Sequence, residues 1–147
     1  MKLRQLSLFL ENRPGQLRAP CQTLGKAGVD IVTLSLADTA QFGILRLIVR
    51  DDEKARQALE EAGFVVNVTD MLAAEVPDRA GGLAGVLEAF DQAALSVEYI
   101  YPLAAGGRGK TAVLVFRVED PDRAARLLQD RGVRILSREE ALQSVGA

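Results

Sequence analysis

Hydrophobic and polar residues alternate along Leu3–Leu10, so that Leu6 and Leu8 share one face of the segment with its last leucine. A period of two is typical of a strand with one buried face. Over Pro14–Ala27 the apolar residues recur at helical spacing instead; a proline suits the first turn of a helix, and Gly28 supplies a stop. The chain is therefore predicted to begin with a half-buried strand and an amphipathic helix.

Four further elements complete the first half of the chain. A polar cluster between two alternating runs predicts a hairpin, and Asp51 opens a second helical run. The resulting order is strand, helix, strand, strand, helix, strand. The predicted elements are strands over Val29–Ala37 and Phe42–Val49, a helix between Asp51 and Gly63, and a strand over Phe64–Val68.

The second half of the chain repeats the first. Asn12–Leu17 follows the first strand, and Asp78–Leu83 follows another strand 66 residues later. The flanking apolar positions keep this offset, which rises to 69 after the second strand, as an insertion in a hairpin would cause. Such self-similarity indicates a duplicated domain. The repeated strands are expected near Asp70–Val76, Ser96–Leu103, Lys110–Val118 and Val133–Leu136.

This order predicts an α+β fold of two tandem ferredoxin-like units, each a four-stranded antiparallel sheet with two helices on one face. We expect the two domains to cover residues 1–69 and 70–147. Ser137 and Glu140 have the spacing of a capping box, in which a hydroxyl and a carboxylate satisfy each other's backbone donors. A short C-terminal helix over Arg138–Val145 should therefore end the second domain.

Each half, at about 70 residues, lies near the size at which one core is only marginally stable. Association of the halves, or of two chains in a homodimer, is therefore expected. The sheet face away from the helices is the predicted surface for a dimer. Its apolar residues are Ile44, Ile48, Val113 and Val115.

Composition removes several classes of function. The 147 residues include no histidine, the side chain best suited to proton transfer near pH 7 and to metal binding. The single cysteine, Cys21, has the helical spacing of a core residue. We therefore expect no catalytic residue, no metal and no cofactor. A net charge of −2 without a basic aromatic sheet face disfavours nucleic acid, and the lack of a long apolar run disfavours a membrane partner.

Two smaller features complete this survey. Gly106–Gly109 lies between two strands and lacks the Lys-Ser/Thr pair of a phosphate loop, so a hairpin turn is expected there. The N-terminus carries Lys2 and Arg4 but no apolar segment with a cleavage site. We expect a cytoplasmic protein.

The loop between the first strand and the first helix is the best candidate for a binding site. A helix N-terminus leaves N–H groups unpaired, so the backbone around Gly15, Gln16 and Leu17 can receive an α-carboxylate. Asn12 offers a donor and an acceptor, and Asp30 can pair with an α-ammonium group. A structural interpretation competes, in which these residues only cap the helix, start it and close the turn.

Leu10–Leu17, followed by Ala27–Ile31, resembles an ACT domain, a small regulatory module that senses amino acids. Asp78–Leu83 and Ala93–Val97 resemble it more loosely. Together they span nearly the whole chain, which looks like a stand-alone tandem ACT protein. The resemblance implies a protein that is not an enzyme. It would bind a free amino acid as effector, at this loop and at an interface between ACT units, and signal to an enzyme of amino-acid metabolism.

The resemblance also implies which residues bind. In many ACT domains asparagine occupies the position of Asp30. In the second repeat Asp78 replaces Asn12 and Ala80 replaces Pro14, so that repeat either binds differently or completes the first site. The expected ligand-binding residues are Asn12, Arg13, Pro14, Gly15, Gln16, Leu17, Asp30, Ile31, Val32, Asp78, Arg79, Ala80, Gly81, Gly82, Leu83, Ser96 and Val97.

Two other functions remain open at this point. The main alternative is an assembly module that keeps the fold without a ligand, and a small enzyme is the third. Ligand-dependent stabilisation separates the first two, because a ligand at a hundredfold excess over Kd raises the free energy of unfolding by about 2.7 kcal/mol.

Overall fold

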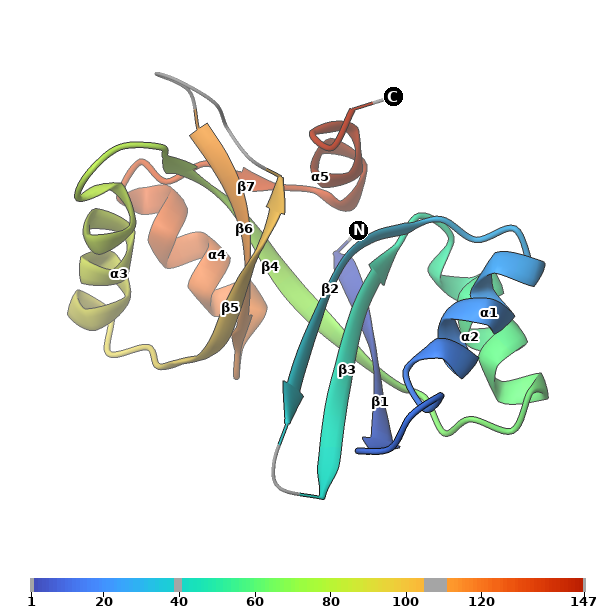
Figure 1. Cartoon of the computed structure of the whole chain (residues 1–147). Helices are drawn as coiled ribbons and strands as arrows, with labels where there is room; N and C mark the ends of the chain where they lie inside the picture. Colours follow the sequence, from blue (N-terminus) through green and yellow to red (C-terminus); the bar gives the residue numbers. More distant parts are fainter. Residues whose placement is uncertain (1, 39–40, 105–110, 147) are drawn as a thin grey trace. The chain divides into compact units, whose positions relative to one another are not determined.

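The computed structural model describes residues 2–38, 41–104 and 111–146. The strands and helices follow one another in the predicted order, except that a single strand, β4, stands where two were expected (Figure 1). The elements are β1 (Leu3–Glu11), α1 (Arg18–Lys26), β2 (Ile31–Asp38), β3 (Phe42–Val49), α2 (Asp52–Glu61), β4 (Asn67–Pro77), α3 (Gly82–Gln92), β5 (Val97–Ala104), β6 (Thr111–Val118), α4 (Pro121–Asp130), β7 (Ile135–Leu136) and α5 (Arg138–Gln143).

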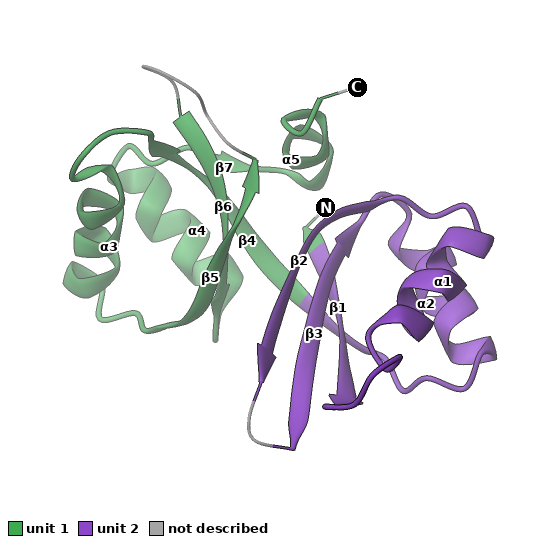
Figure 2. Cartoon of the chain, in the orientation of Figure 1, with its two compact units in different colours: residues 1–3, 70–147 green, residues 4–69 purple. Residues whose placement is uncertain are grey.

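The chain divides into two compact units (Figure 2). Residues 4–69 form the N-terminal unit, drawn in purple. Residues 1–3 and 70–147 form the C-terminal unit, drawn in green. Residues 2–3, at the start of the chain that the structure describes, thus belong with the second unit.

In the N-terminal unit the strands lie in the order β2-β3-β1-β4, and β3 pairs antiparallel with both β1 and β2. Leu8 of β1 faces Leu45 of β3, so both side chains lie on the same face. Leu24 of α1 and Leu59 of α2 join that face in one buried cluster. The two helices therefore cover one face of an antiparallel sheet, as the ferredoxin-like pattern predicts.

The C-terminal unit repeats this arrangement with the strand order β7-β4-β6-β5. Leu72 of β4 faces Phe116 of β6. The ring of Phe116 packs against that of Phe90 of α3, with 5.3 Å between the two ring centroids. Leu128 of α4 lies in the same core cluster. The predicted α+β fold, with two ferredoxin-like units, is confirmed.

The junction between the repeats differs from the prediction. In place of separate strands over Phe64–Val68 and Asp70–Val76, a single strand, β4, runs over Asn67–Pro77. The segment from Val65 to Leu72 contains no glycine, proline or serine that would end a strand. The last strand of one repeat therefore continues into the first strand of the next.

Polar side chains cap the starts of three helices, two of them at the predicted residues Asp51 and Ser137. Asp51 accepts from the N–H of Lys54 at 3.1 Å, and Asp120 caps α4 in the same way. Ser137 and Glu140 form the predicted capping box of α5. That helix ends at Gln143, earlier than the predicted Val145.

The predicted dimer surface is wrong in part. Ile48, Val113 and Val115 are buried within the chain, so they do not present an apolar face to a second copy. Ile44, on the same sheet face, is only partly buried. Phe9, which pairs with Ile44, is 68% exposed. Alternation assigns each side chain to a face of its sheet but does not say which positions on that face the rest of the chain covers.

Candidate functional site

The first strand-to-helix loop forms a tight turn stabilised by its own backbone. The N–H of Arg13 donates to the carbonyl of Glu11 at 2.9 Å, and the N–H of Gln16 donates to that of Arg13 at 3.2 Å. Gly15 has a φ of +85°, a left-handed conformation that glycine adopts without strain. The Gln16 N–H therefore already donates a hydrogen bond within the turn. Gly15 closes the turn, as the structural interpretation expects.

The second loop has the same turn. The N–H of Arg79 donates to the carbonyl of Pro77 at 2.9 Å, the N–H of Gly82 donates to that of Arg79 at 3.0 Å, and Gly81 has a φ of +82°. A Cβ on Gly82 would collide with the Pro77 carbonyl oxygen. The motif repeated in the sequence is thus a repeated backbone structure.

The helix after the first loop begins later than predicted, at Arg18 rather than at Pro14. Gly15, with its left-handed φ of +85°, lies outside the helix, and Pro20 delays the start further because it has no N–H to donate to the carbonyl of Gln16 four residues earlier. The N-cap is Leu17, without a side-chain hydrogen bond. The idea that Asn12 caps this helix is therefore wrong; its own N–H donates to the carbonyl of Gln41 at 3.0 Å.

A cavity of about 360 Å³, called here the first-loop cavity, opens beside this turn. Asn12 and Leu17 line it from the loop, Leu36 from β2, and Arg13 lies at 2.7 Å (Nη2) from Glu11 (Oε2). Asp38 adds a second carboxylate at the end of β2. The cavity thus combines one guanidinium, two carboxylates and apolar side chains. Its full lining is Leu10, Glu11, Asn12, Arg13, Leu17, Leu36, Asp38 and Gly43.

Three other predicted residues of the first loop do not line this cavity. Pro14 and Gly15 are exposed and lie outside the lining of this cavity. Gln16 is partly buried but also lies outside the lining. Arg13 and Leu17 are therefore the side chains through which the turn itself faces the cavity, together with Asn12.

The structure places Asp30, Ile31 and Val32 away from the first loop. Ile31 pairs with Val49 at one end of the N-terminal sheet, whereas Asp38 pairs with Gly43 at the other end, beside the loop. The carbonyl of Asp30 accepts from the N–H of Arg50. Within this unit the two parts of the predicted site do not meet, because α1 carries the chain back along the sheet before β2 starts.

The same separation holds in the second repeat. Ser96 lines a cavity of about 570 Å³ with Glu98, Glu119, Asp120 and Arg123, and Val97 starts β5 beside it. None of the lining residues of this cavity comes from the second loop. Ala94, which precedes β5, has a φ of +55°, an uncommon conformation for a residue with a side chain.

A cavity of about 350 Å³, the second-loop cavity, opens beside the second turn. Of the predicted residues, Arg79, Gly81 and Gly82 line it, whereas Asp78 and Ala80 are exposed outside its lining and Leu83 packs against the core. The remaining lining residues are Glu75, Pro77, Gly85, Val86, Thr111, Arg131, Gly132, Val133 and Arg134.

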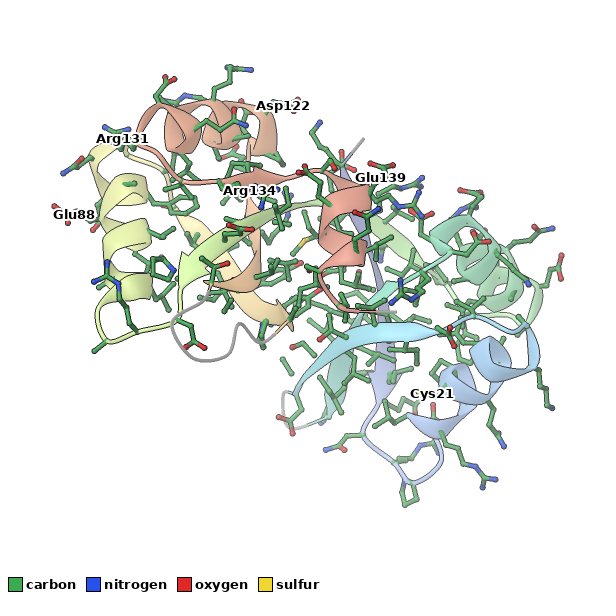
Figure 3. All side chains as sticks on the ribbon, turned by 90° about the horizontal axis from the view of Figure 1, so that it is seen from above. Cys21, Glu88, Asp122, Arg131, Arg134 and Glu139 are labelled. Atoms are coloured by element: carbon green, nitrogen blue, oxygen red, sulfur yellow. The ribbon has the colours of Figure 1, made fainter. Side chains whose placement is uncertain are left out.

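Arg131 and Arg134 were missed by sequence reasoning. They follow α4, far along the chain from the loop, and Figure 3 labels both. The repeat carried a signal, because the positions 69 residues earlier are Ala62 and Val65. Comparison of the two repeats therefore shows that these two positions are charged only in the second repeat. It does not show that they lie close to the second loop.

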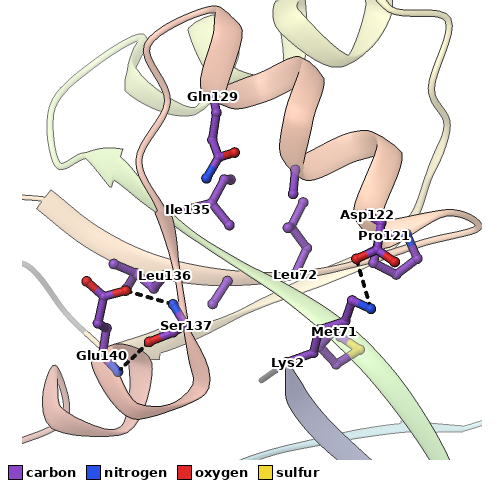
Figure 4. A pocket seen from close by; sticks show the side chains of 12 residues that line it. Lys2, Met71, Leu72, Pro121, Asp122, Gln129, Ile135, Leu136, Ser137 and Glu140 are labelled. Atoms are coloured by element: carbon purple, nitrogen blue, oxygen red, sulfur yellow. Dashed lines mark hydrogen bonds and ion pairs between the residues drawn. The ribbon is translucent and has the colours of Figure 1, made fainter.

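A further cavity that the sequence did not suggest, of about 520 Å³, lies between α4, β7 and the start of α5 (Figure 4). Lys2 lies there with its Nζ at 2.8 Å from Asp122 Oδ1, and this pairing raises the pKa of the lysine. Gln129 extends into the cavity above Ile135, and the capping box of Ser137 borders it.

Within residues 2–38, 41–104 and 111–146, no group of three or more His, Cys, Asp or Glu side chains could hold a metal ion. In the same part of the chain, no helix has the length and apolar character needed to cross a membrane. The expected hairpin at Gly106–Gly109 lies outside the described residues.

The fold and its two loops define a class of protein built from paired βαββαβ modules. The model of the family described as "ACT domain pair" matches residues 1–144. The chain therefore belongs to the ACT domain pair family. ACT domains are regulatory modules rather than catalytic ones.

Solved structures agree with this assignment. A protein from Bacteroides thetaiotaomicron is 34% identical, with a TM-score of 0.88 and 97% of each chain covered. The ligand-free regulatory subunit of aspartate kinase from Thermus thermophilus is 15% identical, with a TM-score of 0.64, 88% of this chain and 93% of that one covered. The corresponding subunit from Thermus flavus has a TM-score of 0.60 at 15% identity, with 88% and 92% covered. No curated protein matches the chain.

Proposed function

We propose that this protein is a non-catalytic regulator that binds a free amino acid beside its first loop and passes that signal to an enzyme of amino-acid metabolism. We also propose that it works as a homodimer, with the ligand at an interface between ACT units, and that residues 1–69 and 70–147 act as its two domains. Membership of a regulatory family supports the general role.

The observation that carries the proposal is the mixed lining of the first-loop cavity. A free amino acid has a carboxylate, an ammonium group and a side chain. The Arg13 guanidinium suits the carboxylate, the Asp38 carboxylate suits the ammonium group, and Leu17 gives an apolar wall. An amino acid with an aliphatic side chain fits this combination best.

We propose that a second ACT unit contributes the remaining ligand-binding residues, which are Asp30–Val32 and the corresponding Ser96 and Val97. Since they lie at the far end of their own sheets from the loops, they reach a ligand only if another ACT unit brings them there. A ligand that contacts two units stabilises one arrangement of them, with a coupling of about 1–3 kcal/mol. That coupling is the proposed route to the enzyme.

Isothermal titration of the intact chain with the twenty amino acids tests binding. A ligand of this size is expected to bind with a Kd of about 10 μM to 1 mM, since even 10 μM demands about 0.7 kcal/mol per heavy atom. Asp38→Asn should weaken binding about tenfold, because it removes one charge-assisted hydrogen bond. Asp91→Asn, the same change at an exposed carboxylate of α3 in the other unit, is the matched control.

The absence of binding for all twenty amino acids at 10 mM (about ten times the weakest expected Kd) would reject the proposal. It would favour the assembly module. Sedimentation of the chain with and without the best ligand tests the output. A monomer in both states would reject the proposed dimer mechanism even where binding itself is found.

A further inference from the structure

The second-loop cavity differs in charge from the first. Three arginines and one glutamate line it, namely Arg79, Arg131, Arg134 and Glu75. The charged residues that line the first-loop cavity are Arg13 with two carboxylates, Glu11 and Asp38. The two cavities thus have opposite net charge, although each opens beside the same backbone turn.

The three guanidinium groups differ in whether they form ion pairs with carboxylates. Arg134 bridges Glu75 at 2.6 Å and Glu140 at 2.9 Å, and these carboxylates raise its pKa. The Nε of Arg131 donates to Oε1 of Gln92, a neutral partner, at 3.2 Å. Arg79 is exposed and forms no ion pair with any residue that the structure describes. The positive charges of Arg79 and Arg131 therefore remain without a carboxylate partner in this region.

Two of the three arginines, Arg131 and Arg134, occur only in the second repeat. Arg79 has a counterpart in Arg13, but the counterparts of Arg131 and Arg134 are Ala62 and Val65, and Val65 is 81% exposed. Clustering like charges around a concave surface is unfavourable unless an anion compensates it. A concave surface with uncompensated guanidinium groups is therefore suited to an acidic ligand.

We propose that the second-loop cavity binds a small dianion, a dicarboxylate or a phosphate compound, through Arg79 with support from Arg131. The Arg134–Glu75 ion pair forms one side of the site. Gly82, whose backbone lies against the Pro77 carbonyl, also lines it. The cavity volume of about 350 Å³ is ample for a ligand of this size. This inference is independent of amino-acid binding at the first loop.

Titration calorimetry of the full chain in 150 mM NaCl tests it, with succinate, glutarate and inorganic phosphate as probes, none of which is an amino acid; this salt suppresses weak non-specific attraction. At least one probe should bind saturably. Arg79→Gln should weaken that binding about tenfold or more, because a charge-assisted hydrogen bond is lost. Arg126→Gln, the same change at an exposed arginine of α4 outside the cavity lining, should leave it unchanged.

The outcomes separate this inference from the proposed function. No saturable binding of any probe at 10 mM overturns it (dissociation constants above about 10 mM correspond to less than about 3 kcal/mol), whether or not a neutral amino acid binds at the first loop. Equal binding by the parent and a folded Arg79→Gln variant also overturns it, and Arg131→Gln provides a second variant should the first fail to fold. The order of affinity among the probes decides between a carboxylate and a phosphate ligand.

Discussion

The two strand-to-helix loops share a backbone turn but not a surface. Gly15 and Gly81 adopt the same left-handed conformation, and the hydrogen bonds of the two turns correspond one to one. The cavity beside the first turn is lined from β2 and β3, whereas the cavity beside the second is lined from the segment after α4. Duplication therefore preserved the local structure, and the residues brought in from elsewhere determine what each copy can bind.

The largest expected effect concerns Gly82, whose counterpart in the first repeat, Gln16, has a side chain. Gly82→Ala should lower the free energy of unfolding by about 1–3 kcal/mol, because the new Cβ would collide with the Pro77 carbonyl. Chemical denaturation measures it. Gly85→Ala is the control: nothing lies near its Cβ, so alanine should raise stability by about 0.5–1 kcal/mol. A neutral Gly82→Ala would show that the two turns differ less than the structure indicates.

The second prediction exchanges residues between the repeats after α1 and α3. Gly28 and its counterpart Ala94 both have positive φ, +71° and +55°. Gly28→Ala should cost about 1 kcal/mol, and Ala94→Gly should gain a similar amount, since only glycine is unstrained there. Thermal denaturation of both variants tests the pair. Shifts of the same sign would contradict the common conformation.

A third prediction concerns α5, which only the C-terminal unit has among the described elements. The Ser137 N–H donates to Glu140 at 3.0 Å and lowers the pKa of that carboxyl below its ordinary 4.5. Because the folded-state pKa is the lower one, this contribution to stability is present above pH 4.5 and is lost as the pH falls through the folded-state pKa.

Amide hydrogen exchange across this pH range should therefore show α5 opening first in acid, after correction for the intrinsic rate. Ser137→Ala should remove the cap at every pH and cost about 1 kcal/mol of local stability. Asp51→Ala, at the cap of α2, is a matched control that should leave α5 protected. Loss of α5 protection that is independent of pH in the parent would refute the capping role of Glu140.

The smallest expected effect is at Pro20. Pro20→Ala restores an N–H that can donate to the Gln16 carbonyl, so α1 should start nearer the position at which α3 starts. The gain is offset by greater freedom of the unfolded chain and by the loss of the buried ring carbons of Pro20, and the net change should be only about 0.5 kcal/mol. A protected amide at position 20 in hydrogen exchange would confirm the earlier start; an unprotected one would contradict it.

Much of the fold was predictable because its signals are local. Alternation in β1, the caps at Asp51 and Ser137 and the glycine stops each depend on residues within a few positions of one another. The start of α1 was mispredicted although its causes, the left-handed Gly15 and Pro20, are also local, because Pro14 was taken as the first-turn proline of the helix. Because Val65–Leu72 contains no glycine, proline or serine, the two predicted strands were expected to follow one another almost directly, and the structure joins them in one strand, β4.

The duplication, the order of the elements and the turn at each loop could be predicted from the amino-acid sequence, since these follow from periodicity and from backbone preferences of individual residues. Which side chains meet at each loop could not, because it depends on how the chain packs in three dimensions. That packing brought Asp38 to the first loop and Arg131 to the second, and it held Asp30 at the far end of its sheet. The physical reason is that a cavity is formed by segments distant in the chain, whose proximity depends on strand register and helix packing rather than on local spacing.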